Sequence, residues 1–137
     1  MIGIVIVAHG GLAREYLAAV EHVVGPLDRV RTIAIAPDSD RAAKQVEICA
    51  AADAVDQGDG VAIVTDLFGG SPSNLSLRAC DPDNRRIIYG ANLPLLITLA
   101  KSRNKPVDEA VAAAARAGRK YIDVHRVHRQ PARTSGR

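Results

Sequence analysis

Apolar runs alternate with segments of helical period along the whole chain. Residues 2–8 form an uninterrupted apolar run, which is typical of a strand buried on both faces of a parallel sheet. Further apolar runs at 30–36, 61–65 and 86–89 predict three more strands. Between the runs, apolar residues recur every three or four positions, as on one face of a helix. Repeated strand–helix units predict an α/β fold, with helices on both faces of a parallel sheet.

Turn and cap residues mark the ends of the predicted helices. The second helix should begin at a cap formed by Asp38 or Ser39 and should bury Ala43, Val46 and Ala50 on one face. Ser-Pro and Asn-x-Pro signals and a further proline predict three later helices, over about 72–80, from Asn92 and Pro94 onward, and over 106–118.

The last part of the chain, from Lys120 onward, lacks the apolar runs of the earlier segments. Lys120–His128 has a strand-like pattern with charges on both faces. We expect a fifth edge strand there, either antiparallel in its own sheet or exchanged with a second copy. The predicted fold is therefore a doubly wound, mostly parallel sheet of order 2-1-3-4-5, as in flavodoxin-like folds. We expect one domain over residues 1–128 and a basic, disordered tail over 129–137.

Composition narrows the class of protein. The chain has 137 residues, of which 47% are hydrophobic and 3% aromatic, so one aliphatic core is expected. The net charge is +3, and basic residues outnumber acidic ones six to one over residues 119–137. Because Tyr121 is the one aromatic ring there, a solvated tail is favoured over nucleic-acid binding. No run is long enough for a membrane span, and the spacing of Cys49 and Cys80 favours reduced thiols in a cytoplasmic protein.

The polar residues that follow strands 1 and 3 carry the candidate chemistry. His9 ends the first apolar run and is followed by two glycines, and Asp66 directly follows the third strand. In the predicted order these strands are neighbours, about 4.8 Å apart, so their tips can bring the two side chains into hydrogen-bond contact. An aspartate that accepts from one imidazole nitrogen fixes the tautomer and leaves the other nitrogen free to act as a nucleophile. The pair therefore predicts phosphoryl transfer through His9.

A glycine-rich turn supplies the third part of the predicted site. Gly69, Gly70 and Ser71 lead into Pro72, a serine-cap and first-turn-proline signal for the start of a helix. Free backbone N–H groups at a helix N-terminus and a serine hydroxyl form a site for an anion such as phosphate. Each feature alone has an ordinary structural explanation, as a loop histidine, a cap or a helix start. Their convergence on one rim of the sheet favours function.

The remaining histidines are not expected to carry chemistry. His22 lies off the apolar stripe of the first helix, which indicates a solvated side chain. His125 and His128 have no carboxylate or thiol partners in their segment, so no metal site is predicted. Asn92 and Pro94 follow the fourth strand, and a role in starting a helix is favoured for them over a role in a pocket.

These segments resemble the IIA component of the mannose-type branch of the bacterial phosphoenolpyruvate:sugar phosphotransferase system (PTS). The resemblance lies in residues 4–10, 65–74 and 90–96 and covers about residues 1–125. It implies that His9 is the phosphorylated histidine and Asp66 its orienting aspartate. It further implies that Ser71 lies near the phosphoryl group, beside the turn formed by Gly69 and Gly70.

The resemblance also implies partners. An HPr-like phosphocarrier would donate the phosphoryl group and a IIB component would accept it, with no cofactor. Members are usually homodimers that exchange the last strand, which would account for Lys120–His128. Because this chain stops at Arg137, where sugar-transporting members often continue into a IIB domain, we expect a stand-alone IIA. A regulatory role is slightly favoured over transport.

Two other classes of function stay open at this point. A small chelatase-like enzyme that inserts a metal would also use a strand-end histidine, although a second ligand opposite His9 is missing from the pattern. A non-catalytic anion-binding module would bind phosphate at the 69–71 turn without covalent labelling.

Overall fold

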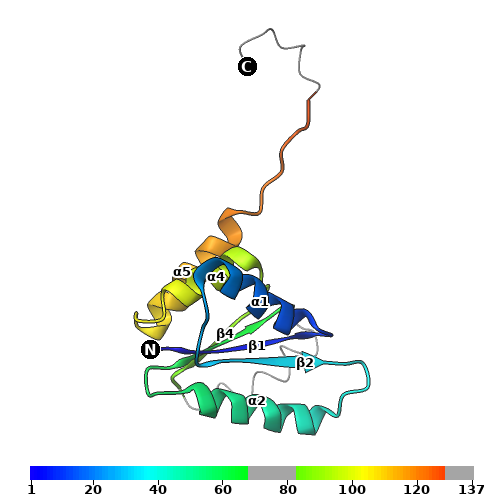
Figure 1. Ribbon diagram of the computed structural model, residues 1–137, viewed down its shortest axis with the longest axis vertical. Coiled ribbons are helices and arrows are strands. Elements are labelled where there is room, and N and C mark those ends of the chain that lie inside the picture. The colour runs from blue at the N-terminus through cyan, green and yellow to red at the C-terminus, as the bar shows by residue number, and fades with distance from the viewer. Residues whose placement is uncertain (68–82, 129–137) are drawn as a thin grey trace.

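The described residues, 1–67 and 83–128 of the computed structural model, contain four parallel strands in one open sheet (Figure 1). The strands are β1 (Gly3–His9), β2 (Val30–Ile35), β3 (Val61–Thr65) and β4 (Arg85–Ile88). Their order is β2-β1-β3-β4, which confirms the predicted order of the first four strands. The connections run one way from β1 to β2 and the other way to β3 and β4. The end of β1 therefore lies at the switch point where open α/β sheets bind their ligands.

Helices cover both faces of the sheet. They are α1 (Leu12–Val24), α2 (Arg41–Val55), α4 (Leu93–Lys101) and α5 (Val107–Lys120). Helices α1, α4 and α5 lie on one face, and α2 lies on the other (Figure 1). Because side chains alternate along a strand, Ile4 and Ile6 of β1 pack under the first group while Val5 and Val7 pack against α2. The first apolar run is thus buried on both faces, as predicted.

Helix α2 corrects two expectations. Its cap is Asp40, whose carboxylate accepts from the N–H groups of Ala42 and Ala43 at 3.0 and 3.3 Å. The hydroxyl of Ser39 instead accepts from the N–H of Ala36 at 2.8 Å, which closes the turn after β2.

The buried face of α2 is also different from the predicted one. It consists of Ile48, Ala52 and Val55, whereas Val46 is 70% exposed. Both sets recur at helical spacing, and in an alanine-rich helix the larger Ile48 and Val55 determine which face packs on the sheet.

Asn92 starts α4 as predicted and also binds α5. Its side-chain oxygen accepts from the N–H of Leu95 at 3.0 Å, and its amide donates to the carbonyl of Gly118 at 2.9 Å. Gly118 is buried at this crossing, and a Cβ there would lie 3.1 Å from the Cβ of Leu95. One asparagine therefore caps one helix and fixes the end of the next, which confirms the structural role favoured for it.

A buried arginine connects three segments at the opposite end of the sheet. The guanidinium of Arg103 donates to the carbonyls of Ile2, Asp28 and Arg29 at 2.8, 2.7 and 2.9 Å. Burial lowers its pKa, but each of its three nitrogens donates one hydrogen bond to a carbonyl. Arg29 has a φ of 56°, a left-handed conformation that costs energy in a non-glycine residue. The bond from Arg103 helps to hold that turn in place.

The predicted fifth strand is not found among the described residues. Residues 122–128, which we name the C-terminal arm, have no regular secondary structure and lead away from the body of the molecule (Figure 1). Ile122, Val124 and Val127 are 74%, 91% and 94% exposed. A strand requires a neighbour for its backbone hydrogen bonds, and the arm pairs with no strand of the sheet. The predicted helix over 72–80 and the tail over 129–137 fall on residues outside the described ranges.

Candidate functional site

His9 lies at the carboxyl end of β1, where the buried strand emerges at the rim. Residues 2–8 are buried, and the His9 side chain is 52% exposed. Gly10 follows with a φ of 56°, and its N–H donates to the carbonyl of Ile35 at 2.9 Å. A glycine adopts this left-handed conformation without steric cost, so the chain turns sharply from β1 into α1. The turn leaves the imidazole half-exposed, and a Cβ built at Gly10 or Gly11 would meet no atom of the described residues within 4 Å.

Asp66 binds His9 through two hydrogen bonds to one carboxylate oxygen. Oδ2 lies 2.9 Å from Nδ1 of the ring and accepts from the backbone N–H of His9 at 3.1 Å. The strand register produces this contact, because β1 and β3 are adjacent and Val7 pairs with Thr65. The juxtaposition expected from the strand order is therefore present. The Asp66 side chain is 12% exposed, so the carboxylate is largely shielded from solvent while the ring that it binds is half-exposed.

This contact fixes which nitrogen of a neutral His9 ring carries the proton. Since a carboxylate accepts hydrogen bonds, Nδ1 carries the proton in the neutral ring and Nε2 keeps its lone pair. No described residue forms a hydrogen bond with Nε2. The half-exposed ring therefore presents an unprotonated nitrogen to solvent, which is the arrangement required of a nucleophile.

Tyr16 of α1 is a further residue next to this site. Its hydroxyl donates to the carbonyl of Ala91 at 3.0 Å, and the N–H of Ala91 donates to the carbonyl of Thr65 at 2.9 Å. Burial and, secondly, the negative charge of Asp66 raise the pKa of Tyr16. Sequence reasoning missed any role here, because a tyrosine on the apolar stripe of a helix is indistinguishable from an ordinary core residue.

The second oxygen of Asp66 has a different environment. Oδ1 is buried and has no hydrogen-bond partner among the described residues. The predicted phosphate-binding residues Gly69, Gly70 and Ser71 lie outside the described residues. The structure thus brings together two of the five predicted site residues.

The other histidines lie away from this pair. His22 is exposed on α1, as predicted. His125 and His128 are exposed on the C-terminal arm. Within residues 1–67 and 83–128, no three His, Cys, Asp or Glu side chains are grouped in a way that could hold a metal ion. In the same ranges no helix is both long and apolar enough to cross a bilayer.

The fold and the site together define a class of protein: an α/β protein with an open parallel sheet and a carboxylate-bound histidine at its switch point. A family model described as EIIA-man, PTS system fructose IIA component, matches residues 3–116. The chain therefore belongs to this family of PTS IIA components. The resemblance seen in the sequence is confirmed.

Individual relatives agree with this assignment. The PTS system mannose-specific EIIAB component of Escherichia coli (strain K12) is 31% identical over 124 residues, which cover 88% of this chain but 38% of that protein. The chain thus spans well under half the length of this curated relative. The PTS IIA protein associated with the fucose utilization operon of Streptococcus pneumoniae is 31% identical with a TM-score of 0.76, covering 88% of this chain and 91% of that one. Phosphotransferase system component EIIA from Streptococcus agalactiae is 25% identical with a TM-score of 0.81, covering 90% and 97%.

Proposed function

We propose that the chain is a cytoplasmic phosphohistidine carrier. Nε2 of His9 accepts a phosphoryl group from an HPr-like protein and passes it to a IIB component or to a regulated target protein. The observation that carries the proposal is the contact of 2.9 Å between Nδ1 of His9 and Oδ2 of Asp66. Membership of the PTS IIA family supports it over the chelatase-like alternative.

The chemistry follows from the orientation of the ring. The lone pair on Nε2 attacks phosphorus in line with the donor's bond, that bond breaks, and its electron pair returns to the donor. The imidazole keeps its proton on Nδ1 and becomes cationic once Nε2 is phosphorylated. The carboxylate of Asp66 stabilises this charge, as the aspartate of a Ser-His-Asp triad stabilises imidazolium. Transfer to the acceptor reverses these steps.

The phosphoryl oxygens need their own donors. The turn of Gly69, Gly70 and Ser71 is proposed to supply them, through backbone N–H groups and the serine hydroxyl. The sequence supports this assignment, since the turn begins three residues after Asp66. Backbone donors would contribute more than the hydroxyl, because glycines allow close approach to the oxygens.

A direct test uses phosphoenolpyruvate labelled in its phosphoryl group, together with purified general PTS donor proteins. We expect one acid-labile, base-stable phosphoryl group per chain, located on His9 by mass spectrometry and absent from His9→Ala. His22→Ala serves as the control, because that exposed histidine should leave labelling unchanged. Label on any other residue, or phosphate binding without covalent labelling, would refute the proposal. The second result would favour a non-catalytic anion-binding module.

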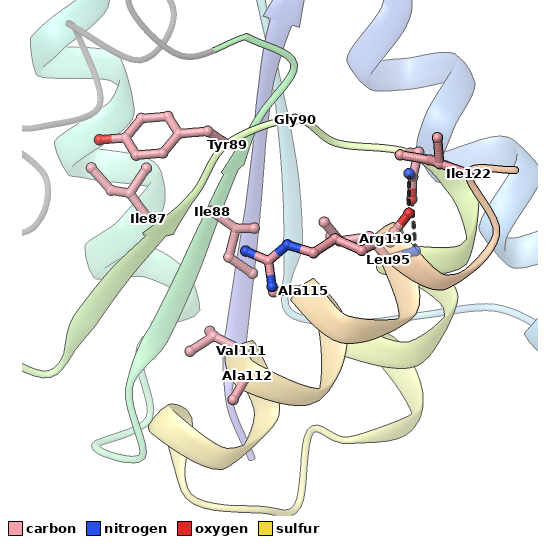
Figure 2. Close-up of a pocket in the computed structure, with 12 residues that line it drawn as sticks. Ile87, Ile88, Tyr89, Gly90, Leu95, Val111, Ala112, Ala115, Arg119 and Ile122 are labelled. Carbon is pink, nitrogen blue, oxygen red and sulfur yellow. Dashed lines mark hydrogen bonds between the residues drawn. The ribbon is translucent and has the colours of Figure 1, made fainter.

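The proposal includes a homodimer that exchanges the C-terminal arm. An apolar groove of about 510 Å³ runs between the edge strand β4 and α5, and Ile87, Ile88, Val111 and Ala115 line it (Figure 2). Figure 2 also shows Ile122 beside the end of α5, where the arm begins. In the sheet that the described residues form, β4 is the last strand, and an arm with exposed apolar side chains is complementary to the apolar groove beside it. The arm of a second copy could therefore supply the fifth strand along β4.

Sedimentation analysis tests the dimer. We expect the chain to sediment as a dimer and Val124→Arg to shift it to monomer, because a charge at the arm's apolar face opposes burial. Val46→Arg on α2 is the matched control, since Val46 is also a largely exposed valine and lies on a different surface. A monomeric wild-type chain would remove this part of the proposal.

A further inference from the structure

Three segments that are distant in sequence meet at the main chain of Ala91. The hydroxyl of Tyr16 donates to its carbonyl at 3.0 Å, and its N–H donates to the carbonyl of Thr65 at 2.9 Å. Tyr16 lies on α1, the helix that follows His9 with only a short turn between them. Thr65 is the residue directly before Asp66. Ala91 therefore connects α1, the helix that follows the histidine, to the end of β3 that directly precedes the aspartate.

This connection limits how the two functional residues can move apart. The strand ladder between β1 and β3 stops at the pair Val7 and Thr65, so Asp66 lies beyond the last paired residue. Beyond that pair, the contacts among the described residues that hold this segment are the bonds of Asp66 to His9 and the bond from the N–H of Ala91 to the Thr65 carbonyl. The hydrogen bond from Tyr16 of α1 holds Ala91 in place, and Ala91 in turn restrains the backbone from which the Asp66 side chain extends.

We propose that Tyr16 is a positioning residue for the His9–Asp66 pair, acting through Ala91 on the strand end from which Asp66 reaches the ring. The inference rests on the proposed phosphocarrier function and deepens it. Asp66 also lies close enough to Tyr16 for its negative charge to add to the effect of burial and raise the pKa of the phenol. Since the hydroxyl of Tyr16 donates to the Ala91 carbonyl and forms no hydrogen bond with His9 or Asp66 among the described residues, its role is indirect.

Tyr16→Phe tests the inference, because it keeps the ring in the core and removes only the hydroxyl. We expect phosphoryl transfer to His9, measured in a single turnover, to slow by about tenfold through misalignment of the pair. A second readout is ¹⁵N NMR of the neutral His9 ring, which reports which nitrogen carries the proton. We expect the variant to gain the form protonated on Nε2, because a looser Asp66 fixes the tautomer less well.

Glu21→Ala provides the matched control on the same helix. Its carboxylate accepts from the N–H of Leu27 at 2.8 Å at the end of α1 far from His9. The control also loses one part-buried bond between side chain and backbone, so a general loss of helix stability affects both variants alike. We expect it to retain the wild-type transfer rate and the wild-type ring spectrum.

The possible outcomes separate this inference from the proposed function. If His9 of the wild-type chain is phosphorylated and Tyr16→Phe matches it in rate and ring spectrum, the positioning role is wrong and the carrier function stands. Equal slowing of Tyr16→Phe and Glu21→Ala, with an unchanged ring spectrum, would also overturn the positioning role. If wild-type His9 takes up no phosphoryl group, the proposed function fails. The ring spectrum of the two variants still decides whether Tyr16 orients the pair.

Discussion

Replacing Asp66 by asparagine removes one negative charge beside Nδ1 of the His9 ring and leaves the size of the side chain nearly unchanged. In the proposed mechanism, that charge stabilises the imidazolium formed when Nε2 is phosphorylated. Asparagine has nearly the same size and keeps one acceptor oxygen, so we expect the fold to be retained. It lacks the charge, and its amide can also present a donor to Nδ1, which would weaken control of the tautomer.

The observed geometry sets the size of the effect. At the 2.9 Å between Nδ1 and Oδ2, opposite unit charges attract by about 6 kcal/mol at an effective dielectric constant of 20 and by about 1.4 kcal/mol at that of water. The His9 side chain is 52% exposed and that of Asp66 is 12%, so an intermediate value near 2.7 kcal/mol applies. This corresponds to a rate loss of roughly a hundredfold, within a range of tenfold to a thousandfold.

Rapid-quench measurement of single-turnover transfer from the phosphorylated HPr-like donor provides the assay. Asp59→Asn is the control: it makes the same charge change at an exposed position where Asp59 binds the N-terminal amino group. We expect that variant to transfer within about twofold of wild type, because a distant exposed charge changes donor encounter only slightly. Transfer by Asp66→Asn at the wild-type rate would show that the carboxylate does not stabilise the phosphorylated ring.

Further predictions concern stability. Arg103→Met leaves three carbonyls without their buried donor, so urea unfolding should show a loss of about 3–5 kcal/mol, whereas the exposed Lys105→Met should stay within about 0.5 kcal/mol. Asn92→Ala should lower the free energy of unfolding by about 2–3 kcal/mol, because it removes both the cap of α4 and the bond to α5. Asn92→Asp keeps the cap and should lower it less. Equal losses in the two variants would contradict the assignment of one role to each side-chain atom. Burial and the charge of Asp66 raise the pKa of Tyr16, so the folded state holds that proton more tightly than the unfolded chain. The free energy of unfolding should therefore fall as the pH rises above about 10, and Tyr16→Phe should reduce that fall.

The strands were predictable because their burial is encoded locally. The run at residues 2–8 contains no charged residue, so a strand buried on both faces was the simplest interpretation, and β1 has that environment. The signals around Asn92 and Pro94 likewise predicted α4, since a cap and a first-turn proline act within four residues. The pattern of neighbouring residues was sufficient to predict an element wherever it favoured a single interpretation.

Local rules failed where neighbouring residues compete for the same role. Asp38, Ser39 and Asp40 are all good N-cap residues, and the choice depends on the turn after β2, which already uses the Ser39 hydroxyl. The arm was predicted as an edge strand from a strand-like pattern with charges on both faces, but a strand also needs a partner edge, and that partner is not specified by the arm's own sequence. Both outcomes depend on tertiary contacts.

At the site, too, the contact that follows from strand order was predictable, and the contact that depends on side-chain packing was not. His9 and Asp66 could be paired in advance because parallel neighbours bring their carboxyl ends to one rim, and the strand order was predictable. The role of Tyr16 was not predictable, because its partner is a main-chain carbonyl in a loop far along the sequence.

The geometry at Asp66 also explains why strand order and chemistry depend on each other here. One carboxylate oxygen accepts both the backbone N–H and the ring Nδ1 of His9, so the ring is oriented relative to its own main chain. Only a residue on the strand directly beside β1, just beyond the paired register, can reach both groups with a side chain as short as aspartate. If β1 and β3 were separated by another strand, the spacing of about 10 Å would exceed that reach. The orientation of the His9 ring is thus a consequence of the β2-β1-β3-β4 order, and any change that loosens the end of β3 should appear first in the tautomer of His9.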